Sequence, residues 1–430
     1  MRRGSSRLTL LLLHAACTAG LSLNLGVGSK IPRSLLSLPY KELLELAGSQ
    51  PAAKYLWRTL RNGEDPTVGW LADDGASGAH HDASGFGLGA RRREAIATSS
   101  RAIDSIGRLV FQSVAADGTR KLLIGLHDGL EVESVIIPPL SRSEESAVAS
   151  NARAHSTLCI SSQVGCRMGC AFCATGRQGL TRNLSTDEIL AQAWLAKATV
   201  AAAGMPPLTN VVFMGMGEPA DNAANVRAAV SVLTNPRQFG FSPKNVLVST
   251  VAPTPAAFAS LVGFNEEDAT PNGANDGEAA LAWSLHAVDE SLRKRLVPTA
   301  RFSPTELRDG LCAALLARPD PRRRRLVVEY VLINGVNGTR HAAAMSTRKL
   351  SCRCAVACRA PPWRCLVRPY GAGPATHDLL QFLAHQSRSA ADPFGATRAR
   401  TDNWPPHVRR QRRRRACTRR VFGTAGRGVS

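Results

Sequence analysis

Acidic residues are scarce in this chain, and it has no long apolar run. Only 33 Asp and Glu residues stand against 54 Lys and Arg residues, so the 430-residue chain carries a formal net charge of +21 at pH 7. A field of this sign attracts polyanions, and we expect a nucleic acid as partner. Arginines crowd the C-terminal part, so a solvated basic tail is the alternative explanation for much of the charge. No apolar segment is long enough to span a bilayer, which excludes a membrane-spanning protein.

The cysteines do not have the dense, regular spacing of a secreted disulfide scaffold, and 11 of them in 430 residues indicate a reducing compartment. Three lie on one short loop with the spacing C-x3-C-x2-C, namely Cys166, Cys170 and Cys173. Thiolates are the usual ligands of iron-sulfur clusters, and three of them leave one iron of a [4Fe-4S] cluster open. That iron can chelate the amino and carboxylate groups of S-adenosylmethionine, whose sulfonium bond splits on reduction to give a carbon radical. Zinc with His155 as fourth ligand is the alternative metal site, and unligated buried thiols are a third interpretation.

The first residues follow the order of a secretory signal. Basic residues at Arg2, Arg3 and Arg7 are followed by an apolar run at 8–13 and then by small residues. We expect residues 1–37 to be a targeting peptide outside the fold. Such a leader in front of an enzyme that needs reducing conditions favours a plastid of secondary origin. A mitochondrion is the alternative, favoured by the acid-free start but disfavoured by the compact leucine run.

Two patterns predict an accessory RNA-binding domain over residues 38–150. Apolar residues at 38–60 recur with helical spacing. Further on, β-rich runs at 121–126 and 131–137 flank an Asp-Gly turn that is typical of a hairpin. Between these patterns, residues 72–94 begin with a mixture of Gly, Ala, Ser, Asp and His without apolar periodicity, which predicts a flexible insertion.

Short β runs alternate with helices from residue 151 to 337. The β runs lie at 157–161, 210–214, 245–249, 281–284 and 326–333. The clearest helix begins with a capping box formed by Ser185 and Glu188. This alternation is the signature of parallel βα units, so we expect an α/β fold, a partial (βα)6 TIM-like barrel of the radical-SAM type with its active site at the carboxyl ends of the strands. Residues 338–430 lose the pattern, and we expect a divergent, partly disordered basic region there.

A glycine-bracketed turn that carries a carboxylate follows the second predicted barrel strand. Gly217 allows close approach of the backbone to a ligand, and Glu218 can accept hydrogen bonds from an ammonium group. Because the turn comes one βα unit after the cysteine loop, we expect it to bind the amino group of S-adenosylmethionine. Ser249, Ser284 and His286 add hydroxyl and imidazole groups at the same rim. Taken singly, each is more often an ordinary polar residue at a strand end.

Together these motifs resemble the RlmN/Cfr class of radical-SAM RNA methyltransferases. The most specific stretches are 158–166, 166–173, 179–184, 214–219, 284–286 and 328–331. The resemblance implies a partial barrel with an N-terminal RNA-binding domain. It also implies that one S-adenosylmethionine methylates a cysteine near the C-terminus, and that a second gives a 5′-deoxyadenosyl radical that takes hydrogen from this methyl group. The resulting carbon radical attacks an adenine ring, at carbon 2 in the housekeeping branch and at carbon 8 in the resistance branch.

The same resemblance implies roles for individual residues. The three loop thiols hold the cluster, while S-adenosylmethionine is contacted by Gly217, Glu218, Ser249, Ser284, Leu285 and His286. Glu133 matches the proton acceptor, although by itself it would be taken for a solvated strand residue. Cys159 matches the thiol that forms a disulfide with the methyl-carrying cysteine and so releases the product. The C-terminal region departs from the family, which indicates an error of reading frame or splicing, and Cys417 is the nearest candidate for the methyl carrier.

We therefore expect a methyltransferase that acts on carbon 2 of an adenine in 23S, the large-subunit, ribosomal RNA, with transfer RNA as a second substrate class. We expect a plastid monomer that binds RNA, has no membrane partner and takes electrons from a ferredoxin or flavodoxin. The alternatives are a radical-SAM enzyme with another substrate and a non-catalytic RNA-binding relative that lacks the methyl-carrying cysteine.

Overall fold

The computed structural model describes most of the chain between residues 33 and 337. The described residues are 33–68, 70, 86–139, 154–262, 279–318, 324, 326–333 and 335–337, together with the backbone of 364–370. All of them belong to one of two units of the chain, which extends to Leu380. The candidate methyl carrier Cys417, the leader up to residue 32 and most of the predicted region 338–430 lie outside the described residues.

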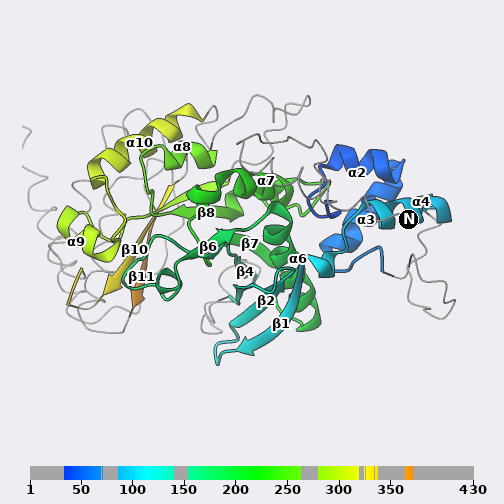
Figure 1. The fold of residues 1–430 in the computed structure, drawn as a ribbon, viewed down its shortest axis with the longest axis horizontal. Coiled ribbons are helices and arrows are strands. Elements are labelled where there is room, and N and C mark those ends of the chain that lie inside the picture. Colours follow the sequence, from blue (N-terminus) through cyan, green and yellow to red (C-terminus); the bar gives the residue numbers. More distant parts are fainter. Residues whose placement is uncertain are drawn as a thin grey trace, which may run out of the picture. The chain divides into compact units, whose positions relative to one another are not determined.

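One mixed sheet of nine strands organises this unit, in the order β1-β2-β3-β4-β7-β8-β9-β10-β11. Its first four strands pair antiparallel, and from β4 onward all pairs are parallel. The antiparallel part comprises β1 Gly107–Val114, β2 Arg120–Leu126, β3 Glu131–Ile137 and β4 Ser156–Cys159. The parallel part continues with β7 Leu208–Phe213, β8 Val246–Thr250, β9 Ala280–Ser284, β10 Leu326–Ile333 and β11 Arg364–Tyr370. Six parallel strands, β4 included, thus lie in chain order across the sheet (Figure 1), which confirms the predicted α/β fold.

Helices connect the parallel strands, as βα units require. They are α6 Thr186–Ala202, α7 Ala223–Thr234, α8 Ala257–Val262, α9 Glu290–Leu296 and α10 Pro304–Ala317. Short 3-10 turns lie at η4 Pro219–Asn222 and η5 Pro243–Asn245. The predicted capping box is present: the Ser185 hydroxyl accepts from the Glu188 backbone, and the Glu188 carboxylate accepts from the Ser185 N–H. This exchange satisfies two N–H groups that would lack partners at the start of α6.

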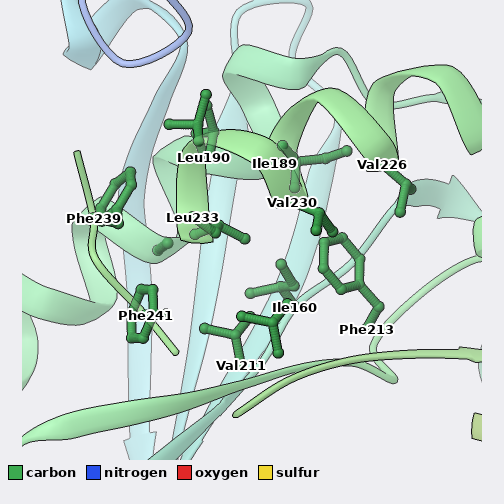
Figure 2. Packing of buried hydrophobic residues seen from close by; sticks show 14 of the residues in the cluster. Ile160, Ile189, Leu190, Val211, Phe213, Val226, Val230, Leu233, Phe239 and Phe241 are labelled. Carbon is green, nitrogen blue, oxygen red and sulfur yellow. The ribbon is translucent and has the colours of Figure 1, made fainter. Parts of the chain in front are cut away.

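The core lies between the sheet and these helices. Apolar side chains of α6 and α7 point toward strand residues of the sheet in Figure 2, where the labelled residues include Ile160, Ile189, Leu190, Val211, Phe213, Val226, Val230 and Leu233. All eight are at most 3% exposed. These helices therefore cover the face of β7 that carries Val211 and Phe213. Polar groups are left to the carboxyl ends of the strands.

The N-terminal helices pack onto the βα units. They are α2 Tyr40–Ala47, α3 Gln50–Arg61 and α4 Ala90–Ser99, followed by the 3-10 turn η2 Ile103–Ser105. At the end of α3 the Arg61 guanidinium donates from Nε to the Gln238 carbonyl at 2.7 Å and from Nη2 to the Pro236 carbonyl at 2.9 Å. The Ser34 hydroxyl donates to the Asp187 carboxylate at the start of α6. These bonds connect segments that are far apart in the sequence.

Two predicted boundaries differ from the structure. Leu35 and Leu36 are at most 2% exposed within the main core, so the packed chain begins before the predicted end of the leader at residue 37. The predicted flexible insertion 72–94 overlaps α4, whose first residues are Arg-rich but whose Ile96 is fully buried. The polar composition did not prevent a helix here, because Ile96 is buried against its neighbours and Arg92 donates to the Ala47 carbonyl at the end of α2.

Two strands of the main sheet, β1 and β11, escaped the sequence analysis. In β1, Phe111 and Val114 are exposed, so the alternation that marks a half-buried strand is missing. In β11, Pro369 interrupts the apolar run, which is tolerated because β11 is the edge of the sheet next to β10. Within the described ranges, no helix is long and apolar enough to cross a membrane.

Candidate active site

The cysteine loop lies between two short strands that form their own antiparallel pair, β5 Gln163–Gly165 and β6 Leu180–Asn183. The Cys166 N–H donates to the Gly179 carbonyl at 2.8 Å, which closes the base of the loop. A Cβ at Gly165 would lie 1.9 Å from that carbonyl oxygen, and Gly165 has a φ of 77°. Only glycine satisfies both constraints, so this residue fixes the entry of the chain into the loop.

The three thiols of the loop are half-buried and close enough to influence one another. Burial, together with the neighbouring Cys166 and Cys173, raises the pKa of Cys170 to about 12. Burial is also the main cause that raises the pKa of Cys166 to about 11. These thiols become ligands only where a strong positive charge compensates their ionisation.

A cubane cluster meets this requirement, because each thiolate binds a different iron of one cationic core. The donor set of three thiols on one loop therefore fits a [4Fe-4S] cluster held by Cys166, Cys170 and Cys173. Across the described part of the chain, no three His, Cys, Asp or Glu side chains converge as ligands of a single metal ion must.

The far side of the loop packs against the segment that follows β9. The Ala171 N–H donates to the Leu296 carbonyl at 2.9 Å, and the Thr299 hydroxyl donates to the Met168 carbonyl at 3.0 Å. Phe172 contacts the imidazole of His286 edge-to-face, with ring centroids 4.8 Å apart. Met168, Leu296 and the neighbouring Val297 form a small apolar cluster around this contact. The loop is thus held from both ends and along its length.

Glu218 lies at the carboxyl end of β7, in the predicted turn. Its side chain is 2% exposed, and its carboxylate accepts from the backbone N–H groups of Ala220 and Val251, each at 3.0 Å. Burial raises the pKa of Glu218 to about 7, against the opposing effect of these hydrogen bonds. The preceding Gly217 has a φ of 106°, and a Cβ there would lie 2.7 Å from the Gln163 side chain. Glycine therefore brings the Glu218 turn directly against β5.

Ser249 and Ser284 meet at the ends of β8 and β9. Their hydroxyl oxygens are 2.9 Å apart, and both hydroxyls donate to Oε2 of Glu329, at 2.9 and 3.2 Å. Glu329 comes from the middle of β10, the next strand of the sheet. The sequence analysis assigned no role to Glu329. The sequence signal that could have identified Glu329 is an acidic residue within an otherwise apolar strand, since such a residue needs polar partners.

His286 follows β9 in a left-handed backbone conformation, with a φ of 59°. Its Nδ1 accepts from the Val331 N–H at 3.2 Å, so this nitrogen carries no proton. Burial lowers the pKa of His286 to about 3, with a further contribution from the charge of Arg293. Asn337 donates to the His286 carbonyl at 2.9 Å and to the Val331 carbonyl at 2.7 Å. These contacts hold a neutral imidazole next to the cysteine loop. Leu285, also predicted to contact the ligand, is fully buried, and its N–H bonds the Glu329 carbonyl.

Glu133 and Cys159 lie on one face of two adjacent strands. Cys159 pairs in register with Val135, and Glu133 is two residues from Val135, so all three side chains share a face. The intervening Ser134 points to the other face, where its hydroxyl donates to Gln192 of α6. The Glu133 carboxylate is 44% exposed and lies 2.9 Å from the Lys121 ammonium. The structure thus brings the two predicted residues onto the face opposite α6.

Comparisons with known proteins place this site in context. The dual-specificity RNA methyltransferase RlmN of Geotalea uraniireducens is 41% identical over 239 residues, which are 55% of this chain and 59% of that protein. The probable dual-specificity RNA methyltransferase RlmN of Acidothermus cellulolyticus is 46% identical over 234 residues, 51% of each chain. This chain thus spans little more than half the length of these curated relatives. No protein-family model matches the chain.

A solved structure extends the similarity beyond these aligned regions. The crystal structure of a radical SAM methyltransferase from Sphaerobacter thermophilus has a TM-score of 0.59 and 27% sequence identity to this chain. The match covers 83% of this chain and 93% of that one.

Proposed function

Because this chain is a relative of the RlmN-family radical SAM RNA methyltransferases over about half of its length, we propose that it methylates carbon 2 of an adenine in large-subunit ribosomal RNA, with transfer RNA as a second substrate class. The observation that carries the proposal is the cysteine loop, whose thiols Cys166 and Cys170 are close enough to Glu218 for this buried carboxylate to raise their pKa. A loop of three thiols fits a cluster with an open iron, and Glu218 fits the amino group of the ligand bound there.

The residues present would hold both cofactors. Cys166, Cys170 and Cys173 would hold the [4Fe-4S] cluster, which supplies the electron that splits S-adenosylmethionine, with a ferredoxin or flavodoxin as the donor class. Glu218 would accept hydrogen bonds from the amino group of the ligand, and these would offset the burial of its own charge. The neutral His286 would add no positive charge to the site.

Three further residues act on the RNA side of the reaction. Glu133 accepts the proton that leaves the adenine ring, and its exposure allows this proton to pass to solvent. Cys159 resolves the bond between protein and RNA by forming a disulfide with the methyl-carrying cysteine. Cys417 is the candidate carrier, by its position near the C-terminus.

An organellar location accompanies this proposal. The basic, apolar and small-residue order of the first residues supports a plastid rather than a mitochondrion. A fusion of residues 1–37 to a fluorescent protein in a plastid-bearing host tests the location. Fluorescence confined to mitochondria or to the cytosol would contradict it.

The test of function is anaerobic incubation of the reconstituted protein with ribosomal RNA, transfer RNA, dithionite and S-adenosylmethionine, followed by mass spectrometry of the nucleosides. We expect 2-methyladenosine in RNA from the wild type and none from Cys170→Ala. Formation of 5′-deoxyadenosine without RNA methylation would instead indicate another substrate. A loaded cluster that never cleaves S-adenosylmethionine would indicate a non-catalytic relative, and 8-methyladenosine would move the target to carbon 8.

The role of Cys159 has its own test. Without a resolving thiol, the product stays bound through the methylene-bearing sulfur, so Cys159→Ala should accumulate a covalent protein-RNA adduct. Denaturing electrophoresis detects it, and Cys312→Ala, a change in α10, is the matched control. The pair is made both in this chain and in a version whose C-terminal reading frame is restored. Normal turnover by Cys159→Ala would refute the assigned role.

A further inference from the structure

Arg293 is a buried cation, and one of its three guanidinium nitrogens has no hydrogen-bond acceptor among the described residues. It lies in α9, and its side chain is 1% exposed. Its Nε donates to the Leu285 carbonyl at 3.2 Å, and its Nη2 donates to the Val251 carbonyl at 2.7 Å. Its Nη1 is buried and has no hydrogen-bond partner among the described residues. A buried guanidinium nitrogen without an acceptor carries a desolvation penalty that a ligand or ion would remove.

The surroundings of Arg293 contain neutral carbonyls but no carboxylate at ion-pair distance within the residues that the structure describes. Burial lowers the pKa of Arg293 to about 10, and the thiol of Cys170 is close enough to act on it in the opposite direction. Arg293 therefore stays protonated at neutral pH. A buried positive charge of this kind is destabilising, and an anion in the completed site would offset that cost.

The contacts of α9 direct this charge toward the cysteine loop. Leu296, one helical turn after Arg293, accepts the Ala171 N–H with its carbonyl. Leu292 and Leu296 pack in the same small cluster as Cys166 and Cys170. Helix α9 is thus fixed against the cysteine loop by Leu292, which precedes Arg293, and by Leu296, which lies one turn after it.

We propose that Arg293 is the counter-charge of the iron-sulfur cluster, that it donates its free Nη1 hydrogen to a sulfur of that cluster, and that it thereby raises the cluster's reduction potential. The inference rests on the proposed function for the presence of the cluster. A cluster bound by three thiolates becomes more negative on reduction, so a fixed positive charge stabilises the reduced form more than the oxidised one. Hydrogen bonds to the sulfurs act in the same direction.

This role makes Arg293 a positioning and tuning residue rather than a catalytic one. Its two carbonyl bonds also fix the chain after β8 and β9, where Val251 supports Glu218 and Leu285 precedes His286. A purely structural role would therefore lower stability without shifting the potential. The carboxylate of S-adenosylmethionine is the alternative acceptor for Nη1. If Nη1 binds that carboxylate and not the cluster, removing Arg293 would not change the reduction potential of the cluster in the absence of S-adenosylmethionine.

The experiment compares wild type, Arg293→Gln and Arg293→Lys after anaerobic reconstitution, with S-adenosylmethionine absent. Iron content, melting temperature and the midpoint potential from an EPR-monitored redox titration are measured for each. We expect Arg293→Gln to reduce the ratio of reduced to oxidised cluster about tenfold at a fixed solution potential, a shift of about 59 mV for one electron. We expect Arg293→Lys, which keeps the charge, to stay near the wild type.

Each result decides the question. Full iron content with an unchanged potential in Arg293→Gln overturns the proposal, and weaker binding of S-adenosylmethionine in that variant would assign Nη1 to the ligand. Loss of iron in Arg293→Gln but not in Arg293→Lys, at equal melting temperature, supports the counter-charge. Loss of iron and of stability in both variants overturns it in favour of a structural role. A wild type that binds no iron contradicts the proposed function itself.

Discussion

Glu218, Cys166, Cys170 and His286 are buried groups whose charged forms are unfavourable without a ligand. At neutral pH both thiols and the imidazole are neutral, and Glu218 is only partly ionised. Cluster assembly must therefore release protons from the thiols, and ligand binding must draw a proton from Glu218. The site is accordingly coupled to pH at the level of single residues.

Replacing Cys170 by alanine should abolish cluster assembly. A site with three protein ligands has no fourth thiolate in reserve, so loss of one leaves two irons without protein ligands. The measurement is visible absorption and iron content after anaerobic reconstitution. Cys312→Ala, in α10, is the control and should keep its iron. Stoichiometric zinc without iron in the wild type would contradict the cluster.

Binding of S-adenosylmethionine should strengthen as the pH rises through about 7. Since burial raises the pKa of Glu218 to about 7, the carboxylate is mostly protonated below that pH and ionised above it, and only the ionised form can accept hydrogen bonds from the ligand's amino group with both oxygens. We expect about a tenfold gain in affinity from about pH 6 to about pH 8. Calorimetric titration of the reconstituted protein measures it.

Glu218→Gln should bind S-adenosylmethionine more weakly at every pH and lose this dependence, with its iron content unchanged. The control is Glu306→Gln, which alters an exposed capping carboxylate of α10. The same pH dependence in Glu218→Gln would assign the titration to another group. An unaltered affinity would leave residues 215–219 as an ordinary turn of the barrel.

At the scale of elements, the Glu329 carboxylate joins β8, β9 and β10 through the hydroxyls of Ser249 and Ser284. Glu329→Gln replaces charge-assisted hydrogen bonds by neutral ones, so both serines lose part of their orientation. We expect about tenfold weaker binding of S-adenosylmethionine and a small change in melting temperature. A double-mutant cycle with Ser249→Ala separates the two possible routes. Non-additive losses support action through the serine, whereas additive losses would show that Glu329 acts independently.

The elements that could be predicted from the sequence are those whose signals are local. The β2–β3 hairpin has its Asp-Gly turn between two β-rich runs, and α6 has both halves of its capping box within four residues. The three thiols and Glu218 were likewise visible, because their spacing and their place after strands follow from the chain alone. By contrast, β11 gains its partner only from β10, and Arg293 stands among many other basic residues. Their roles depend on contacts that no short stretch of sequence contains.

At the scale of the whole described unit, Arg61 connects the N-terminal helices to the βα units through the carbonyls of Pro236 and Gln238. Arg61→Ala removes a charged donor from the carbonyl of the buried Gln238 and from the exposed carbonyl of Pro236. We expect the free energy of unfolding to fall by about 2 kcal/mol. Urea denaturation followed by circular dichroism measures the change.

Arg33→Ala is the matched control for that experiment. Arg33 forms an exposed ion pair with Glu42 at 3.7 Å, and such pairs contribute little to stability. We expect a loss of less than about 0.5 kcal/mol. Equal losses in both variants would show that Arg61 stabilises the protein only through its general charge.

The chain order of the parallel strands has a consequence for synthesis on the ribosome. Each of β7, β8, β9, β10 and β11 pairs with the strand that precedes it in the main sheet, and β4 pairs with β3 before it. A nascent chain can therefore add each strand to an edge that has already been translated, without waiting for a later segment. The cysteine loop emerges before Arg293 and Glu329 do. The loop therefore remains uncovered on one side until the segment around Leu296, whose carbonyl accepts from the Ala171 N–H, has been made.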